Sequence, residues 1–282
     1  MSRLEPFVFA GATAVLTGAA SGMGEQLAHQ LADRGTALVL LDRDADRLDR
    51  VAAAVRVAHP GLGVEVHVVD LAETARIASL VAEILAAHPR VDLLVNNAGI
   101  ALAGRFDQIS LEDFDAVLRV NLTAPVTLTH HLLPTLLASP GSHVVNVSSL
   151  YGLIAPPGQS AYATSKFGLR GFSQVLQAEL GGRGVGVTTV HPGGIRTRIA
   201  ETARVGQGVD PQQAAVGKAR AARVLTYPAE RAAADILEAV EHRRVRLLIA
   251  PSAKVPDALA RLLPVGHVRA LSWLMGGGGR RR

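Results

Sequence analysis

The sequence predicts an α/β fold, namely a doubly wound, mainly parallel sheet of seven strands with helices on both faces. Two observations support this prediction. Seven short runs are almost continuously apolar, which is typical of parallel strands buried on both faces. The stretches between these runs carry apolar residues at helical spacing, so strands and helices alternate along the chain. Right-handed crossovers then place helices on both sides of the sheet.

The predicted strands are short apolar runs that end at glycine, polar or acidic residues. The first run leads directly into a glycine-rich turn, and the second ends before an acid. In chain order the predicted strands are Thr13–Thr17, Ala37–Leu41, Val64–Val69, Val91–Val95, His143–Val147, Val185–Val190 and Val245–Ile249.

Glycine and proline limit the predicted helices. Gly35 closes the first, and Pro60 and Pro89 stop the second and third. In order they are Gly24–Arg34, Ala45–Ala58, Ala72–Ala87, Leu111–Leu137, Ala161–Leu180 and Pro228–Val240. We expect Pro125 and Pro134 to interrupt the long fourth helix. With no linker and no internal repeat, residues 1–252 are predicted to form one domain.

Composition limits the class of protein. The chain has 282 residues, 49% of them hydrophobic, which is enough for one full α/β core. It has no cysteine, which excludes disulfides and thiolate metal sites. We find neither a signal peptide nor an apolar run of transmembrane length, so we expect a cytoplasmic protein. With 4% aromatic residues and no basic stripe in the body, nucleic-acid binding is not expected.

The net charge of +5 is concentrated at the C-terminus, because residues 243–282 hold nine Lys/Arg and one acid. Residues 253–282 are predicted to form a basic amphipathic extension packed on the domain, with apolar positions Leu259, Leu262, Leu263, Val268, Leu271 and Leu274. Contact of this tail with a membrane surface is the alternative. Residues 198–226 are weakly patterned and are predicted to be an irregular substrate loop.

The stretch from Ser149 to Lys166 carries the candidate chemistry. Tyr162 and Lys166 lie four apart on a predicted helix, so they share one face. A nearby ammonium group is expected to lower the pKa of a phenol, which then exchanges a proton with an alcohol or carbonyl oxygen. The turn at 156–158 would fold Ser149 back beside Tyr162. A chance pairing of Tyr and Lys on a helix is the alternative interpretation.

A second candidate site follows the first strand. The turn has the spacing Gly-x-x-x-Gly-x-Gly, and a helix begins there. Glycines let a pyrophosphate approach backbone N–H groups, and the helix N-terminus favours its negative charge. The predicted cofactor-binding residues of this turn are Gly18, Ser21, Gly22, Met23 and Gly24. Tight packing of a helix on a strand is the alternative.

Polar residues end the next three strands, at the edge where open α/β sheets bind ligands. Asp42 is placed to accept hydrogen bonds from an adenosine ribose and to repel a 2′-phosphate, so NAD is favoured. Arg43 would partly reverse this preference, and NADP stays an alternative. Asp70 and Leu71 would meet the adenine, or Asp70 would cap the next helix. At the end of the fourth strand we expect cofactor contacts from Asn97, Ala98 and Gly99, with Asn97 also bracing the strands.

The combination of motifs resembles the short-chain dehydrogenase/reductase family in its single-domain, Rossmann-type branch, over about residues 10–200. The motifs are TGAASGMG (17–24), NNAG (96–99), Asn121, Ser149, YATSK (162–166) and PGGIRT (192–197). The resemblance implies an NAD(P)-dependent oxidoreductase that transfers a hydride between nicotinamide and a secondary alcohol or ketone. It also implies a homodimer or homotetramer.

The resemblance also implies a role for each matching residue. Tyr162 would be the general acid/base, Lys166 would bind the nicotinamide ribose, and Ser149 would polarise the substrate oxygen. Asn121 would kink the long helix and hold a relay water. The loop holding the nicotinamide carboxamide would comprise Pro192, Gly193, Ile195 and Thr197.

The sequence leaves alternatives for the class of substrate and for whether the protein is an enzyme. Segments 101–108, 150–160 and 198–226 are mostly small and apolar, which favours a sterol-like or long-chain substrate. A non-catalytic NAD(H) sensor is the competing class, and a nucleotide-sugar epimerase or dehydratase ranks below both. No metal site is expected, because His191 has no second histidine at ligand spacing.

Overall fold

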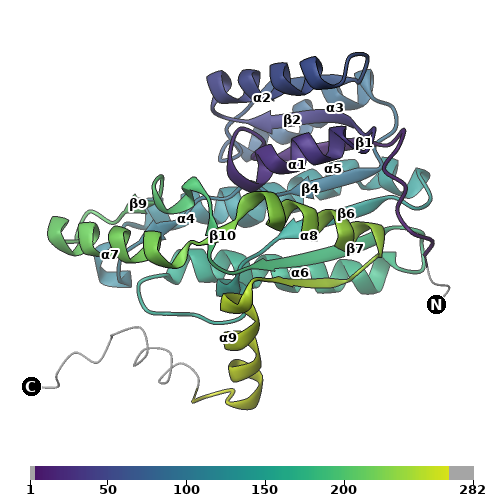
Figure 1. Cartoon of the computed structure of the whole chain (residues 1–282). Coiled ribbons are helices and arrows are strands. Elements are labelled where there is room, and N and C mark those ends of the chain that lie inside the picture. The colour runs from purple at the N-terminus through teal and green to yellow at the C-terminus, as the bar shows by residue number, and fades with distance from the viewer. Residues whose placement is uncertain (1–3, 267–282) are drawn as a thin grey trace, which may run out of the picture.

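A computed structural model describes residues 4–266 and confirms the predicted architecture (Figure 1). All seven strands of the main sheet run parallel, in the order β11-β7-β6-β4-β1-β2-β3. Their bounds are β1 Thr13–Thr17, β2 Ala37–Asp42, β3 Val64–Val68, β4 Leu93–Asn96, β6 His143–Val147, β7 Gly186–Pro192 and β11 Arg246–Ile249.

The order of the strands fixes where a ligand can bind. The chain leaves β1 for β2 and β3 on one side and then returns to β4 on the other, so the direction of winding reverses between β1 and β4. Val15 of β1 pairs with Val39 of β2 and with Leu94 of β4. The crevice outside the carboxyl ends of β1 and β4 is therefore the binding position of this architecture.

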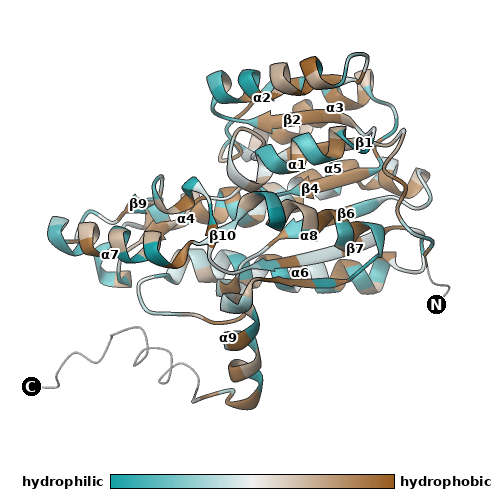
Figure 2. Ribbon diagram, in the orientation of Figure 1, coloured by the Kyte–Doolittle hydropathy of each residue, from teal (hydrophilic) through white to brown (hydrophobic). Residues whose placement is uncertain are grey.

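Helices cover both faces of the sheet. The bounds of the principal helices are α1 Gly22–Ala32, α2 Ala45–Ala58, α3 Ile77–Ala87, α5 Ala124–Ala138, α6 Ser160–Leu180 and α8 Ala229–Glu241. On one face α1, α2 and α8 bury Leu27, Leu48 and Ile236, and on the other α3, α5 and α6 bury Ile84, Leu128 and Leu176. Figure 2 shows the strands as hydrophobic ribbons between helices with hydrophilic outer turns. Burial of the apolar side chains between the helices and the two faces of the sheet is the main stabilising contribution to the fold.

The long helix predicted over Leu111–Leu137 is divided at the segment that holds Asn121, the residue that the family resemblance implied would kink it. It consists of α4 (Leu111–Leu118), a π-helical segment (Arg119–Thr123) and α5. Pro125 lies in the first turn of α5, directly after the π segment, and Pro134 lies inside α5 without ending it. The prediction that Pro134 interrupts the helix is therefore wrong, and the one division lies at the π segment beside Pro125.

The prediction of an irregular segment over 198–226 is also wrong. The segment holds a 3₁₀ turn (η5, Arg198–Ala200), the short strand β9 (Arg204–Val205) and the helix α7 (Pro211–Val224). The Asp210 carboxylate caps α7 by accepting the N–H groups of Gln212 and Gln213 at 2.9 and 3.0 Å. No residue of α7 is buried, so its sequence carries no strong apolar stripe. Figure 1 shows α7 and α4 together outside the carboxyl edge of the sheet.

Short elements complete the chain. They are η1 Thr74–Arg76, β5 Leu102–Ala103, η2 Phe106–Gln108, η4 Leu150–Gly152, β8 Ile195–Arg196 and β10 Tyr227–Pro228. Strand β5 pairs with β9, and β8 pairs with β10. These two small ribbons join segment 101–108 to segment 198–226, and the loop after β7 to the start of α8.

Helix α9 (Pro251–Leu262) begins the C-terminal extension and points away from the body (Figure 1). Its buried residues are Ala253 and Asp257, and the Asp257 carboxylate accepts hydrogen bonds from Arg246 and Arg261. Leu262 is 79% exposed. The predicted apolar positions Val268, Leu271 and Leu274 lie outside the described residues. No helix within residues 4–266 combines the length and apolar character needed to cross a membrane.

Candidate active site

The glycine turn after β1 forms a backbone cradle. Gly18 has φ 67°, a conformation that L side chains rarely adopt. A Cβ on Gly24 would lie 1.8 Å from the carbonyl oxygen of Gly18, so α1 approaches the strand as closely as glycine permits. Ser21 is the N-cap of α1, and its side chain makes no capping hydrogen bond. The first N–H groups of α1 and the Ser21 hydroxyl are therefore open to an anionic ligand.

The end of β4 holds this turn in place. The Asn97 side-chain amide donates to the carbonyl oxygens of Thr17 and Gly18 at 3.0 and 3.2 Å. The Thr17 hydroxyl in turn accepts the backbone N–H groups of Asn97 and Ala98, both at 3.0 Å. The bracing role expected of Asn97 is confirmed, and these bonds fix the turn against the strand that lies beside it in the sheet.

The two acids at the strand ends cap local turns. The Asp42 carboxylate accepts the N–H groups of Ala20 and Asp44 at 3.0 and 3.1 Å. The Asp70 carboxylate accepts the N–H of Ala72 at 2.9 Å. Neither acid caps the next helix, since Asp44 and Glu73 occupy the N-cap positions of α2 and η1. Both also line a pocket, which leaves further lone pairs of these carboxylates available to a ligand.

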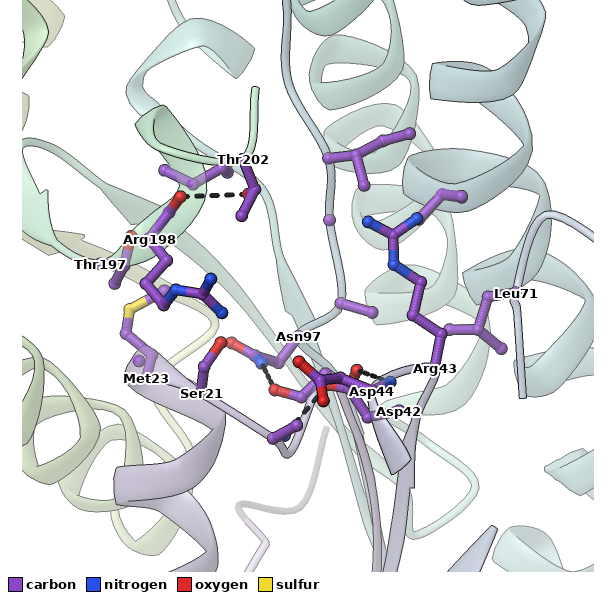
Figure 3. A pocket seen from close by; sticks show the side chains of 18 of the residues that line it. Ser21, Met23, Asp42, Arg43, Asp44, Leu71, Asn97, Thr197, Arg198 and Thr202 are labelled. Carbon is purple, nitrogen blue, oxygen red and sulfur yellow. Dashed lines mark hydrogen bonds between the residues drawn. The ribbon is translucent and has the colours of Figure 1, made fainter. Parts of the chain in front are cut away.

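This pocket of about 290 Å³ lies at the crevice between β1 and β4 (Figure 3). Its lining includes most of the predicted cofactor residues, namely Gly18, Ser21, Gly22, Met23, Asp42, Arg43, Asp70, Leu71, Asn97, Ala98, Gly99 and Thr197. Gly24, Pro192, Gly193 and Ile195 do not line it. Residues that the sequence reasoning missed also line it, namely Ala20, Asp44, Val69, Ile100, Val120, Arg198, Ile199 and Thr202.

The predicted catalytic residues lie beside the pocket, not in its lining. Gly99 lines the pocket and also lies against two of the predicted catalytic residues, because a Cβ there would lie 3.3 Å from both Asn121 Oδ1 and Lys166 Nζ. Asn121 sits in the π-helical segment, a feature that is frequent at functional sites. Its side-chain amide accepts the N–H of Ile100 at 2.8 Å and donates to the Ile100 carbonyl at 2.9 Å and to Ser165 Oγ at 3.1 Å.

Tyr162 and Lys166 share one face of α6 and are both buried, with 9% and 2% of their surfaces exposed. Lys166 Nζ donates to the carbonyl oxygen of Val147 at 2.8 Å and lies 5.7 Å from the centre of the Tyr162 ring. Ser149 Oγ accepts the N–H of Tyr151 at 3.1 Å, and Ser149 also hydrogen-bonds the Tyr162 side chain. The structure thus brings the predicted Ser, Tyr, Lys and Asn together.

The expected lowering of the Tyr162 pKa by Lys166 is not observed. Burial raises the pKa of Tyr162 to about 12, against the opposing effect of the hydrogen bond with Ser149. Burial also lowers the pKa of Lys166 to about 8. The physical reason is that Lys166 faces the ring and a backbone carbonyl, while the loss of hydration disfavours the charged form of each group.

Three supporting residues escaped the sequence reasoning. Ser148 Oγ donates to the carbonyl oxygen of Lys166 at 2.9 Å, and Ser165 Oγ, which holds Asn121, donates to the carbonyl oxygen of Tyr162 at 2.7 Å. His191 Nδ1–H donates to the Ser149 carbonyl at 3.0 Å, and burial lowers the pKa of His191 to about 4. Ser148 and Ser165 adjoin motif residues in sequence, which was the available signal.

The loop after β7 contacts both the glycine turn and α9. Thr197 lies against Gly22, since a Cβ on that glycine would be 3.1 Å from the Thr197 side chain. Ser252 Oγ at the start of α9 accepts the N–H of Gly194 at 2.9 Å. Ile195 is buried, and Pro192 ends β7 beside Ile249. Within residues 4–266 no group of three or more metal-ligating side chains gathers.

The family match is extensive. A sequence model described as "short chain dehydrogenase" matches residues 12–208. SadH of Mycobacterium tuberculosis, which is named an oxidoreductase, is 38% identical over 267 residues, which cover 94% of this chain and 95% of SadH. The parallel sheet, with a glycine cradle at its crevice and a Ser-Tyr-Lys-Asn set beside it, defines a doubly wound protein of the Rossmann type. The chain belongs to the short-chain dehydrogenase/reductase family of oxidoreductases.

Solved structures agree with this assignment. A short-chain dehydrogenase/reductase from Burkholderia phymatum in complex with NAD has a TM-score of 0.83 at 28% identity, over 92% of this chain and 95% of that chain. A short-chain dehydrogenase from Sphingobium yanoikuyae in complex with NADPH has a TM-score of 0.74 at 29% identity, over 96% of this chain and 98% of that chain.

Proposed function

We propose that the protein transfers a hydride between a nicotinamide cofactor and the carbon of a secondary alcohol or ketone, with Tyr162 as the general acid/base. One observation carries the proposal. Gly99 lines the pocket at the sheet crevice and at the same time lies against Asn121 and Lys166. A dinucleotide that fills the pocket and passes Gly99 would bring its reactive end to the buried Tyr162.

The residues present fit a dinucleotide. A side chain on Gly24 would collide with the Gly18 carbonyl, so glycine lets α1 begin close to the end of β1, with its first N–H groups at the pocket. The Ser21 hydroxyl and the first turn of α1 would hold the diphosphate. Asp42 and Asp70 would meet the adenosine ribose and the adenine, and Thr197 the nicotinamide carboxamide.

NAD is the favoured cofactor. The two solved relatives are complexes with NAD and with NADPH, so the proposal rests on this chain's own residues. Asp42, Asp44 and Asp70 all line the adenosine end of the pocket, and Arg43 is the cation among them. Three carboxylates against one guanidinium favour a free ribose hydroxyl over a 2′-phosphate.

A bound nicotinamide supplies or accepts the hydride, and the protein's residues manage the proton and the substrate oxygen. Tyr162 Oη passes the proton, while Ser149 Oγ, which hydrogen-bonds Tyr162, orients the substrate oxygen. Lys166, which lies beside Gly99, would donate to a ribose hydroxyl. Asn121 fixes the backbone of Ile100, next to that glycine.

The protonation state of Tyr162 determines how each direction of the reaction depends on pH. With a pKa of about 12, its phenol carries the proton at neutral pH and serves as the acid for reduction of a ketone. Oxidation of an alcohol needs the phenolate. The rate of oxidation is therefore expected to rise as pH increases above neutrality, whereas the rate of reduction is expected to fall at alkaline pH.

The proposed substrate is apolar. The ring of Tyr151 packs edge-on against that of Tyr162 with 6.1 Å between centroids, so an aromatic wall adjoins the reacting hydroxyl. Leu102, Val117 and Ala161 form a small buried apolar cluster, against which Ile100, Ile109 and Phe114 pack, and Ala161 directly precedes Tyr162. A sterol-like or long-chain secondary alcohol or ketone suits these surroundings better than a charged sugar.

Turnover of a panel of sterols, long-chain secondary alcohols, small polyols and anionic sugars with NAD and NADP tests the proposal, together with Tyr162→Phe. We expect turnover of the apolar alcohols with NAD. The variant should lose at least about a hundredfold in kcat, because it lacks the proton-transferring hydroxyl, yet bind NADH within about twofold of the unaltered protein. Unchanged turnover in Tyr162→Phe would refute the role of this residue. Cofactor binding without turnover of any panel member would favour the sensor alternative.

A further inference from the structure

The 3₁₀ turn η5 faces the glycine cradle from across the pocket. Thr197 lies against Gly22 at the first turn of α1, and the chain enters η5 at the next residue. Arg198, Ile199 and Thr202 then line the pocket. Figure 3 shows the Arg198 guanidinium directed into the pocket on the side of Ser21 and Met23. The opening N–H groups of α1 and the head of Arg198 therefore border the same part of the pocket.

The charges around the pocket are divided between its two ends. Its acidic lining residues, Asp42, Asp44 and Asp70, lie at the ends of β2 and β3, and Arg43 lies with them. Of the residues that line this pocket, Arg198 is the other cation, and it comes from the opposite wall. The first turn of α1 thus has the Arg198 guanidinium facing it, whereas the Asp42 carboxylate contacts the glycine turn further back, at the N–H of Ala20. A cation that faces open N–H groups favours an anion between them.

The backbone of Arg198 is held more firmly than its side chain. The carbonyl oxygen of Arg198 accepts the backbone N–H of Thr202 at 2.9 Å and the Thr202 hydroxyl at 3.1 Å. Among residues 4–266 the guanidinium has one ion-pair contact, 3.6 Å to Glu201, and the two side chains are 39% and 66% exposed. An exposed ion pair of this kind contributes little. The guanidinium is therefore free to exchange Glu201 for a stronger anionic partner.

We propose that Arg198 binds the diphosphate of the cofactor, from the wall opposite the first turn of α1. This inference rests on the proposed function, since the ligand is the dinucleotide of that same site. A guanidinium pairs with phosphate oxygens through two parallel N–H···O bonds. The diphosphate is then held between backbone N–H groups on one side and a side-chain cation on the other. Through Arg198, cofactor binding also becomes linked to the segment 198–226.

The test compares Arg198→Gln with the matched control Arg196→Gln. Arg196 lies two residues earlier on β8, is exposed and does not line the pocket. Each variant removes one positive charge from the same loop. Dissociation constants are measured by calorimetry for NADH, NADPH, ADP-ribose and adenosine, with the melting temperature recorded to verify folding. ADP-ribose carries the diphosphate and adenosine does not, so the pair isolates the group that Arg198 is proposed to bind.

We expect Arg198→Gln to raise the dissociation constants of ADP-ribose and of the favoured dinucleotide about tenfold. The dissociation constant of adenosine should change less than about twofold. Arg196→Gln should change the dissociation constants of all four ligands by less than about twofold. Arg198→Lys should recover part of the loss. Equal weakening of ADP-ribose and adenosine, or equal effects of the two Gln variants, would overturn the inference while leaving the proposed function intact. Failure of the unaltered protein to bind either dinucleotide would overturn both.

A second measurement follows the link to segment 198–226. ADP-ribose should slow proteolytic cleavage of this segment in the unaltered protein and in Arg196→Gln. At concentrations that saturate each protein, the protection should be reduced in Arg198→Gln, because the ligand no longer contacts the start of the segment. Equal protection in all three proteins would contradict this link.

Discussion

The glycine turn and the segment 198–226 border the same pocket but are built in opposite ways. In the turn, a Cβ on Gly24 would meet the Gly18 carbonyl at 1.8 Å, and Asn97 and Thr17 lock the backbone from β4. In the segment, α7 buries no residue, and a Cβ on Gly217 would meet nothing within 4 Å. The glycine turn therefore tolerates no additional atom at Gly24, whereas the exposed helix α7 of the segment tolerates one at Gly217.

This difference separates two tasks of the molecule. A cofactor with a constant shape is matched by backbone groups that cannot move without disturbing the sheet. Substrates differ between family members, and an exposed helix that adds little to the core can change without cost to the fold. The comparison predicts that substitutions in the two walls have effects of different size and sign.

The largest effect is expected for Gly24→Ala. The new methyl group would force α1 away from β1, because its neighbours include the backbone oxygen of Gly18 as well as the Asn97 amide. We expect a loss of roughly 3 kcal/mol in the free energy of unfolding and at least about a hundredfold in NADH affinity. Urea denaturation and calorimetric titration measure the two quantities.

Gly171→Ala in α6 is the matched control, since a Cβ there meets nothing within 4 Å. It should bind NADH as the unaltered protein does. If Gly24→Ala behaved like this control, the close approach of α1 to β1 would not be needed for binding.

Lys166→Met is expected to have an intermediate effect on the free energy of unfolding, and to increase it where Gly24→Ala decreases it. The folded-state pKa of about 8 lies below the unfolded value of about 10.5, so the unfolded chain binds more protons between these values. Stability should rise with pH through this window, and below pH 8 the buried ammonium lowers the free energy of unfolding by up to about 3 kcal/mol. Lys166→Met should raise the melting temperature at pH 7 and abolish turnover.

The pH dependence of unfolding separates this explanation from simple repacking. In the unaltered protein, denaturant midpoints measured from pH 7 to pH 10 should increase, and the part of the increase due to Lys166 should be absent in Lys166→Met. If the denaturant midpoints of the two proteins changed in parallel with pH, burial of the ammonium would not be the cause of any gain in stability.

The smallest effect is expected for Gly217→Ala. Alanine in a helix interior is favoured over glycine by about 0.5–1 kcal/mol, and no neighbour opposes the methyl group. Because α7 is exposed, we expect this gain to appear locally, as a two- to fivefold slowing of amide hydrogen exchange in α7. The melting temperature of the body should change little. A shift of the global transition instead would mean that α7 unfolds together with the sheet.

The sheet and the residues at its carboxyl edge were predictable because burial on both faces leaves an apolar signature. The run Thr13–Thr17 is both a predicted strand and β1, and Gly18, Asp42 and Asn97 follow strands whose ends meet by topology. Tyr162, Lys166, Ser149 and Asn121 were found through motif spacing, and the structure brings them together.

Features that depend on distance or exposure could not be predicted. Helix α7 was missed because a helix without buried residues needs no apolar stripe, although Asp210 and Pro211 marked its start. The raised pKa of Tyr162 follows from burial, and sequence spacing alone suggested only the neighbouring ammonium. Arg198 directly follows the loop motif, but that it faces the cradle depends on how Thr197 meets Gly22.

The π-helical segment Arg119–Thr123 constrains how the length of this chain can change. An α-helix turns about 100° per residue, so the loss of one residue here would close the bulge and rotate one side of the helix by that amount against the other. Asn121 would then swing away from Ile100 and Ser165, or α5 would turn Leu128 out of the core. Single-codon insertions and deletions should therefore be eliminated in this helix, whereas the exposed segment around α7 is free to gain or lose residues.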